Sequence, residues 1–228
     1  MSLLRDHRRR PALLLAAALV LGGSLVVASQ VGSGREEAAP PPPAPVSARS
    51  TFAGVPQQGV ALGSPKAPVT LVEYADLQCP FCAEWAHRTL PVLVDQYVRT
   101  GKVRIVFRGL AFIGPDSDRA LRAAVAAGRQ NRLWDVIDGL YHRQGAENSG
   151  WVTDGLLEEI AGARALSDVS HPWLDGQIAI AGRAARAVEI HGTPAFELGR
   201  TGGRLQVVQP SSLGPEGLSP AIEQALSS

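Results

Sequence analysis

Two cysteines, Cys79 and Cys82, are the side chains of this sequence best suited to chemistry, and no other cysteine occurs among its 228 residues. They enclose Pro80 and Phe81 in a Cys-Pro-Phe-Cys motif. If the motif opens a helix, the three-residue offset places both sulfurs on one helix face, close enough to form a disulfide. The first sulfur then lies beside unpaired backbone N–H groups and the positive end of the helix dipole, which favour thiolate over thiol. The spacing therefore predicts a redox-active pair.

A structural disulfide and a metal site are the alternatives for this pair. Closing a four-residue loop stabilises a fold by about 2 kcal/mol, against about 4.7 kcal/mol for a hundred-residue loop, so the pair would be a poor staple. A structural zinc site needs four ligands. His87 follows the motif, but the sequence offers no second cluster of ligands. Redox chemistry is the better interpretation, and no metal is predicted.

A lowered pKa at Cys79 would decide the direction in which the pair works. Moving this pKa from about 8.5 to about 5 raises the thiolate fraction at pH 7 roughly thirtyfold, but lower basicity costs a similar factor in nucleophilicity. The reduced form would gain about 2.7 kcal/mol at pH 7, which corresponds to about 60 mV of oxidising power. We therefore expect a disulfide donor.

The elements that must position the motif follow from the pattern around it. Residues 69–74 are rich in β-branched and apolar side chains, which predicts a buried strand ending just before the motif. Apolar side chains recur at helical spacing over 80–100, where Pro91 is expected to kink the helix. Residues 103–107 alternate in polarity and predict a second strand. Strand, helix and strand form a βαβ unit with a parallel pair.

Beyond this unit the pattern becomes helical. Several helices are predicted over about 114–182. Residues 195–198 and 205–208 flank a glycine-rich turn as a hairpin, and a final helix begins near 219. The sequence thus predicts one α/β domain over 59–228.

The first 58 residues have a different character. Residues 1–10 form a basic tail, and residues 11–29 carry no charge and are long enough, at roughly 28 Å, to cross a membrane as a helix. Basic residues before such a span place the rest of the chain outside the cytoplasm. A cleaved signal peptide ending near Ala28 is the alternative, with the same consequence. Residues 30–58 are rich in proline and predict a disordered linker.

The charge balance argues against nucleic-acid binding. The whole chain carries 22 basic and 21 acidic residues, a formal charge of +1. From residue 59 onward there are 16 basic and 18 acidic residues, so this part has a net charge of 16 − 18 = −2. Such a domain lacks the basic excess that neutralises phosphates.

Two ordered motifs make the chain similar to a known family. The run LGSPKAPVTLVEY at 62–74 is followed by DLQCPFC at 76–82, and GTPAF stands at 192–196 beyond the helical stretch. In this order the motifs resemble the DsbA family of extracytoplasmic thiol-disulfide oxidoreductases, in particular its membrane-anchored members. The resemblance covers about 60–228. It implies an α/β fold of the thioredoxin-like type with an inserted helical domain.

The resemblance also assigns roles to residues. Cys79 would be the exposed nucleophile that forms a mixed disulfide with a client, and Cys82, one turn deeper, would resolve it. Pro194 would be a cis-proline whose missing N–H leaves neighbouring backbone free to pair with an extended client strand. Thr193 would lie beside the sulfurs. Glu73, six residues before Cys79, would be a buried acid that takes the proton from Cys82, provided that burial raises its pKa.

The predicted function is a thiol-disulfide oxidoreductase that donates the Cys79–Cys82 disulfide to reduced exported proteins. It needs no bound cofactor because the disulfide carries the electrons, and the resemblance implies a quinone-linked membrane reoxidant of the DsbB or VKOR type. Strong oxidants of the family often carry His where this chain has Phe81, so we expect a weaker oxidant. Two alternatives stay open: a reductase or isomerase that runs the same chemistry in reverse, and a redox-inert extracytoplasmic binding domain.

Overall fold

The computed structural model describes residues 51–228. Three of the predicted segments lie outside this range: the basic tail at 1–10, the membrane span or signal peptide at 11–29, and the linker up to residue 50. Among residues 51–228, no helix is both long and apolar enough to cross a membrane. Both cysteines lie in the described part of the chain.

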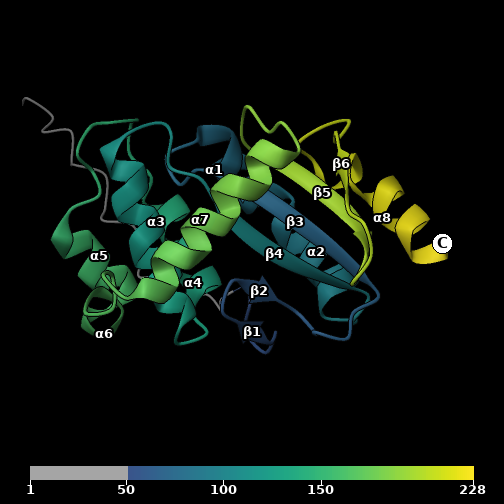
Figure 1. Cartoon of the computed structure of the whole chain (residues 1–228), viewed down its shortest axis with the longest axis horizontal. Helices are drawn as coiled ribbons and strands as arrows, with labels where there is room; N and C mark the ends of the chain where they lie inside the picture. Colours follow the sequence, from purple (N-terminus) through teal and green to yellow (C-terminus); the bar gives the residue numbers. More distant parts are fainter. Residues whose placement is uncertain (1–50) are drawn as a thin grey trace, which may run out of the picture. The chain divides into compact units, whose positions relative to one another are not determined.

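A six-stranded sheet in the order β1-β2-β4-β3-β5-β6 runs through the described residues (Figure 1). Strand β3 (Val69–Ala75) is parallel to β4 (Val103–Gly109) and antiparallel to β5 (Ala195–Arg200). Every residue of β3 is buried, because the strand has neighbours on both sides and helices over both faces. The predicted βαβ unit is confirmed.

Successive side chains of β3 point to opposite faces of the sheet. Leu71 belongs to the main core together with helix α1 (Pro80–Arg88), whereas Tyr74 packs against α7 (Pro172–Ala187) on the other face. Figure 1 shows α7 crossing this second face of the sheet. By the same alternation Glu73 points to the α1 side, where the cysteines lie.

The helix predicted over 80–100 is divided in the structure. After α1 come a short α2 (Leu90–Leu93) and a π-helical turn, η1 (Val94–Val98). The break falls at Thr89, two residues before Pro91. Pro91 has no N–H to donate to the carbonyl of His87, so the first helix ends ahead of it.

Helices fill the connection between β4 and β5, which confirms the predicted helical insertion. The insertion reaches Ala187, beyond the predicted limit at 182, because α7 continues across the sheet. Alanines of the first of these helices, among them Ala120 and Ala124, are fully buried, and such small side chains permit close helix packing. Before α7, the described helices of the insertion are α3 (Pro115–Gly128), α4 (Leu133–His142), α5 (Asp154–Ala161) and α6 (Ala163–Leu166).

The C-terminal part completes the sheet. Strand β6 (Gln206–Val208) pairs with β5 as the predicted hairpin. A 3₁₀ turn, η2 (Pro215–Gly217), then leads into the predicted last helix, α8 (Ser219–Ser227). Ile222 of α8 is fully buried in the main core, so this helix covers the same face as α1.

The disordered linker was predicted to end at residue 58. This boundary is wrong, because residues 51–58 belong to the folded domain. Phe52 is only 2% exposed, and its ring lies 5.9 Å from that of Trp134, edge to face. Strand β1 (Gln57–Gln58) pairs with β2 (Ala61–Leu62), which in turn pairs with β4. A buried aromatic residue and backbone pairing offset the entropy of ordering this segment.

Candidate active site

Cys79 stands directly before the first turn of α1, as the motif predicts. It is the N-cap residue, with extended backbone angles (φ −72°, ψ 120°), and Pro80 follows in the first turn, where a missing N–H costs nothing. Both cysteines are free thiols. Cys82 is 0% exposed and Cys79 5%, so Cys79 is less exposed than expected. The reason is the loop around Thr193, whose carbonyl oxygen lies 3.3 Å from the Cys79 sulfur and accepts its hydrogen bond when Cys79 is protonated.

The surroundings of Cys79 lower its pKa to about 6. The hydrogen bond from the Cys82 thiol is the largest cause, burial opposes it, and the Thr193 hydroxyl and the N–H groups of Cys82 and Phe81 add to it. The helix N-terminus therefore acts as expected, but the neighbouring thiol contributes more. A pKa of about 6 stabilises the reduced form by about 1.4 kcal/mol at pH 7, or about 30 mV, which is half of the effect expected for a pKa of about 5.

The pKa of Cys82 moves in the opposite direction, well above its ordinary value of 9.0. Burial is the main cause, and the negative charges of Cys79 and Glu73 add to it. Cys82 therefore holds its proton at neutral pH and donates a hydrogen bond to the Cys79 thiolate. The two sulfurs are thus differentiated into a thiolate and a thiol.

Glu73 is buried on the same side of the sheet. Its side chain is 2% exposed, and desolvation raises its pKa to about 8. The condition set by the sequence argument, that burial must raise this pKa, is met. Glu73 carries a proton at neutral pH and is electrostatically coupled to Cys82.

The loop ahead of β5 brings Thr193 and Pro194 to the sulfurs. The peptide bond between them is cis. The Thr193 hydroxyl oxygen is buried and has no nitrogen or oxygen partner within residues 51–228. Its hydrogen bonding lowers the pKa of both Cys79 and Cys82. Of the residues singled out from the sequence, Thr193 contacts Cys79 and Glu73 is coupled to Cys82, and Pro194 follows Thr193 directly.

Asp76 is a residue of this site that the sequence reasoning did not single out. It is 0% exposed and lies between β3 and the motif, three residues before Cys79. Its carboxylate accepts hydrogen bonds from the Ser117 hydroxyl at 2.6 Å and from the Gln78 backbone N–H at 2.9 Å. The available signal was an acid directly after an apolar strand and before a reactive pair. Ser117, however, lies 41 residues along the chain, too far for spacing to reveal it.

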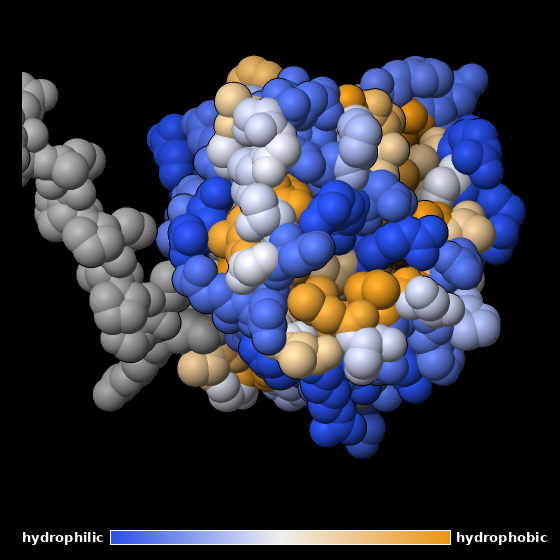
Figure 2. Space-filling view, turned by 90° about the vertical axis from the view of Figure 1, so that its left-hand side faces the viewer, coloured by the Kyte–Doolittle hydropathy of each residue, from blue (hydrophilic) through white to orange (hydrophobic). Residues whose placement is uncertain are grey.

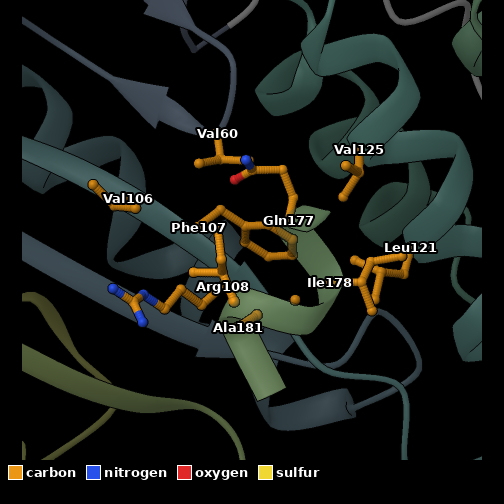
Figure 3. Close-up of a pocket in the computed structure, with 11 residues that line it drawn as sticks. Val60, Val106, Phe107, Arg108, Leu121, Val125, Gln177, Ile178 and Ala181 are labelled. Carbon is orange, nitrogen blue, oxygen red and sulfur yellow. The ribbon is translucent and has the colours of Figure 1, made fainter. Parts of the chain in front are cut away.

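Two hollows elsewhere in the domain offer no comparable chemistry. The first lies between β4 and α7, with the Phe107 ring at its centre and Arg108 pointing away, and its lining includes no cysteine, histidine or acid (Figure 3). The second lies in the helical insertion, the side seen in Figure 2, where apolar atoms are enclosed by polar ones. It is lined by Leu157, Leu166 and Val169, with the ion pairs Arg119–Asp154 and Arg122–Asp118 at its rim.

The family model described as thioredoxin matches residues 56–204, so the chain belongs to the thioredoxin family. A probable disulfide bond formation protein D of Bacillus cereus is 38% identical over 102 residues, which cover 44% of this chain and 47% of that protein. The disulfide bond formation protein D of Bacillus subtilis is 30% identical over 118 residues, or 51% of each chain. The chain thus spans about half the length of the curated relatives it matches.

Solved structures show the same fold over a larger part of the chain. Oxidised BdbD of Bacillus subtilis superimposes with a TM-score of 0.64 at 22% identity, covering 76% of this chain and 98% of BdbD. A thioredoxin-like oxidoreductase from Silicibacter pomeroyi has a TM-score of 0.60 at 27% identity, covering 78% and 96%. The thioredoxin-like α/β fold with a helical insertion is therefore confirmed.

Proposed function

We propose that this protein is a thiol-disulfide oxidoreductase that forms disulfide bonds in exported proteins by donating the Cys79–Cys82 disulfide. The observation that carries the proposal is that the two sulfurs differ in their surroundings and in their pKa. Cys79, at the start of α1, favours the thiolate, and Cys82, three residues later and fully buried, favours the thiol. A stabilised Cys79 thiolate stabilises the reduced protein, which makes its disulfide a better oxidant. The likeness to disulfide bond formation proteins of Bacillus supports the same activity.

The reaction is a pair of thiol-disulfide exchanges. A client thiolate attacks the Cys79 sulfur of the oxidised protein, so that a client–Cys79 disulfide forms and the Cys82 sulfur leaves. A second client thiolate then attacks the client sulfur of this mixed disulfide and releases Cys79 as a thiolate. The client loses two electrons, and the Cys79–Cys82 pair gains them. Cys79 leaves readily in this second step because its pKa is lowered to about 6.

Glu73 supplies the proton that the first step needs. Burial makes a Cys82 thiolate unfavourable, so the departing sulfur must be protonated as it leaves. With a pKa of about 8, Glu73 is protonated at neutral pH and lies on the same face of the sheet. When the exchange runs backward, Glu73 takes the proton from Cys82, the role assigned to it from the sequence.

Thr193 and Pro194 form the client side of the site. Pro194 has no N–H, so the backbone next to it is left to pair with an extended client segment passing over Cys79. The Thr193 hydroxyl stabilises the negative charge on either sulfur by hydrogen bonding. We propose that this exchange takes place outside the cytoplasm, with residues 11–29 as the anchor and a quinone-linked membrane protein of the DsbB or VKOR type as the reoxidant.

The proposal is tested with the oxidised protein and a reduced, unfolded client. We expect wild type to form client disulfides and Cys79→Ala to form none. With a client that already carries a disulfide, the reduced Cys82→Ala variant should accumulate client–Cys79 adducts on non-reducing gels, because Cys79 attacks the client disulfide and no Cys82 is present to resolve the product. Absence of client oxidation by the wild type would favour a redox-inert binding domain. The Cys79–Cys82 potential measured against glutathione separates donor from reductant, and a thioredoxin-like, strongly reducing value would contradict the proposal.

A further inference from the structure

The loop between β3 and α1 is fixed by one buried carboxylate. Oδ1 of Asp76 accepts hydrogen bonds from the Gln78 N–H at 2.9 Å and the Ser117 hydroxyl at 2.6 Å. Oδ2 accepts from the N–H groups of Phe112 and Ile113 at 3.1 and 3.2 Å. These donors come from the loop itself, from α3 and from the segment between β4 and α3. Asp76 therefore joins the approach to the motif to the start of the helical insertion.

The backbone of Asp76 also forms a hydrogen bond with the nucleophile, Cys79. Its carbonyl oxygen accepts the N–H of Cys79 at 3.0 Å. It also accepts the hydroxyl of Tyr141, a buried residue of α4, at 3.4 Å. The residue that carries the carboxylate thus also fixes the backbone of Cys79.

Further hydrogen bonds from the insertion hold the remaining residues of the loop. Nε2 of Gln144 donates to the carbonyl of Leu77 at 2.9 Å and to that of Cys79 at 3.2 Å. Oε1 of Gln78 accepts the N–H of Asn148 at 2.7 Å. Hydrogen bonds hold the loop from several directions. Asp76, which is 0% exposed, takes part in more of these bonds than any other residue of the loop.

We propose that Asp76 is a positioning residue for Cys79: its carboxylate ties the loop to the helical insertion and so holds the Cys79 sulfur against the first turn of α1 and against Thr193. This inference rests on the proposed function, since it names a residue that prepares the thiolate for exchange. It also gives the helical insertion a part in the chemistry, because Ser117, Tyr141 and Gln144 all belong to it. Asp76 touches neither sulfur and acts through the backbone.

Positioning and simple electrostatics predict opposite outcomes for Asp76→Asn. Removing a negative charge three residues from Cys79 would by itself ease thiolate formation and lower the midpoint of the Cys79 titration. If Asp76 positions the loop, the side-chain NH₂ group of Asn faces N–H and O–H donors and cannot accept their hydrogen bonds. The loop then loosens, and the midpoint of the Cys79 titration rises. We expect a rise of about 0.5 to 1 pH unit, a three- to tenfold loss of thiolate relative to thiol.

The measurement is the far-ultraviolet thiolate absorbance of the reduced full chain as a function of pH. Ser117→Ala changes no charge but removes the bond to Asp76, together with the bond that Ser117 accepts from Nε2 of Gln78 at 3.0 Å. We expect a smaller shift in the same direction, and this variant decides the matter if Asp76→Asn does not fold. Asp116→Asn is the matched control, because Asp116 is buried beside Ser117 yet accepts from the N–H of Gly150 at 2.9 Å and not from a residue of the loop. An unchanged or lowered midpoint in Asp76→Asn or Ser117→Ala, or an equal rise in the control, would overturn the proposal.

The titration needs no client, so its result is independent of the proposed activity. A wild type that oxidises no client refutes the proposed function, whereas a midpoint insensitive to Asp76 and Ser117 refutes only the positioning role. In variants that show the rise, a client-oxidation potential shifted toward weaker oxidation confirms that the loop acts through Cys79. A merely structural role would lower unfolding stability and leave both the midpoint and the potential in place.

Discussion

The two sulfurs of the site lie three residues apart and in opposite surroundings. Cys79 meets donors: the Cys82 thiol, the Thr193 hydroxyl and the first amides of α1, which together lower its pKa to about 6. Cys82 meets apolar core and the acid Glu73, and its pKa is raised well above 9.0. Burial is the main cause of the raised pKa of Cys82, whereas at Cys79 the hydrogen-bond donors outweigh burial. One helical turn is enough to separate a thiolate from a thiol.

The largest expected effect comes from removing the acid on the Cys82 side. Glu73→Gln keeps the shape but not the transferable proton, so we expect client oxidation below pH 8 to slow about a hundredfold. Wild-type Glu73 loses its proton as pH rises through about 8, so the ratio of wild-type to variant rates should fall toward unity above that pH. Taking the ratio at each pH cancels the ionisation of the client thiols.

Glu197→Gln is the matched control for this experiment. Glu197 is also buried, at 7% exposed, and lies on β5 beside β3, but it accepts the Tyr74 hydroxyl at 2.6 Å on the opposite face of the sheet. We expect its rate and pH profile to match the wild type. Equal losses in the two variants would show that any buried acid of the sheet matters, and that Glu73 has no proton-transfer role.

A second prediction concerns the stability that the Cys79 thiolate provides. The pKa of Cys79 is lower in the folded protein than its ordinary value of 9.0, so this contribution is complete above pH 9 and is lost as pH falls through about 6. The unfolding free energy of the reduced protein, relative to the oxidised one, should rise by about 1 kcal/mol from pH 6 to pH 7. Urea unfolding of both forms measures it. Glu73 is present in both the reduced and the oxidised protein, so its titration does not affect the difference between them. If the two unfolding free energies change with pH in parallel, the pKa of Cys79 is not lowered by folding.

The smallest expected effect tests a single donor on the Cys79 side. Thr193→Val is nearly isosteric and removes the hydroxyl that lowers the pKa of Cys79. Because the Cys82 thiol and the helix amides remain, we expect the midpoint of the thiolate titration to rise by only about half a unit, or threefold. Thr193→Ser keeps the hydroxyl and should keep the midpoint. A valine variant that titrates like the wild type would leave Cys82 and the helix as the sources of the shift.

Much of the fold and of the site could be predicted because its signals are local. The run at 69–74 had to be a buried strand, and the Cys-Pro-Phe-Cys motif had to open a helix, whatever lies elsewhere in the chain. The division of the helix after Arg88 and the packing of Phe52 were not predictable in this way. Each depends on what a segment meets in space, since Phe52 is ordered by Trp134, a residue far along the chain.

The sequence by itself determined the chemistry, two sulfurs at redox spacing on the first turn of a helix, and the order of the elements that carry them. Only the tertiary structure decided how strongly each sulfur holds its proton and which residues keep Cys79 in place. Desolvation at Glu73 depends on every element that covers it, and the Phe112 and Ile113 amides reach Asp76 across 36 and 37 residues. Such quantities depend on three-dimensional distance, which the spacing of residues along a chain does not contain.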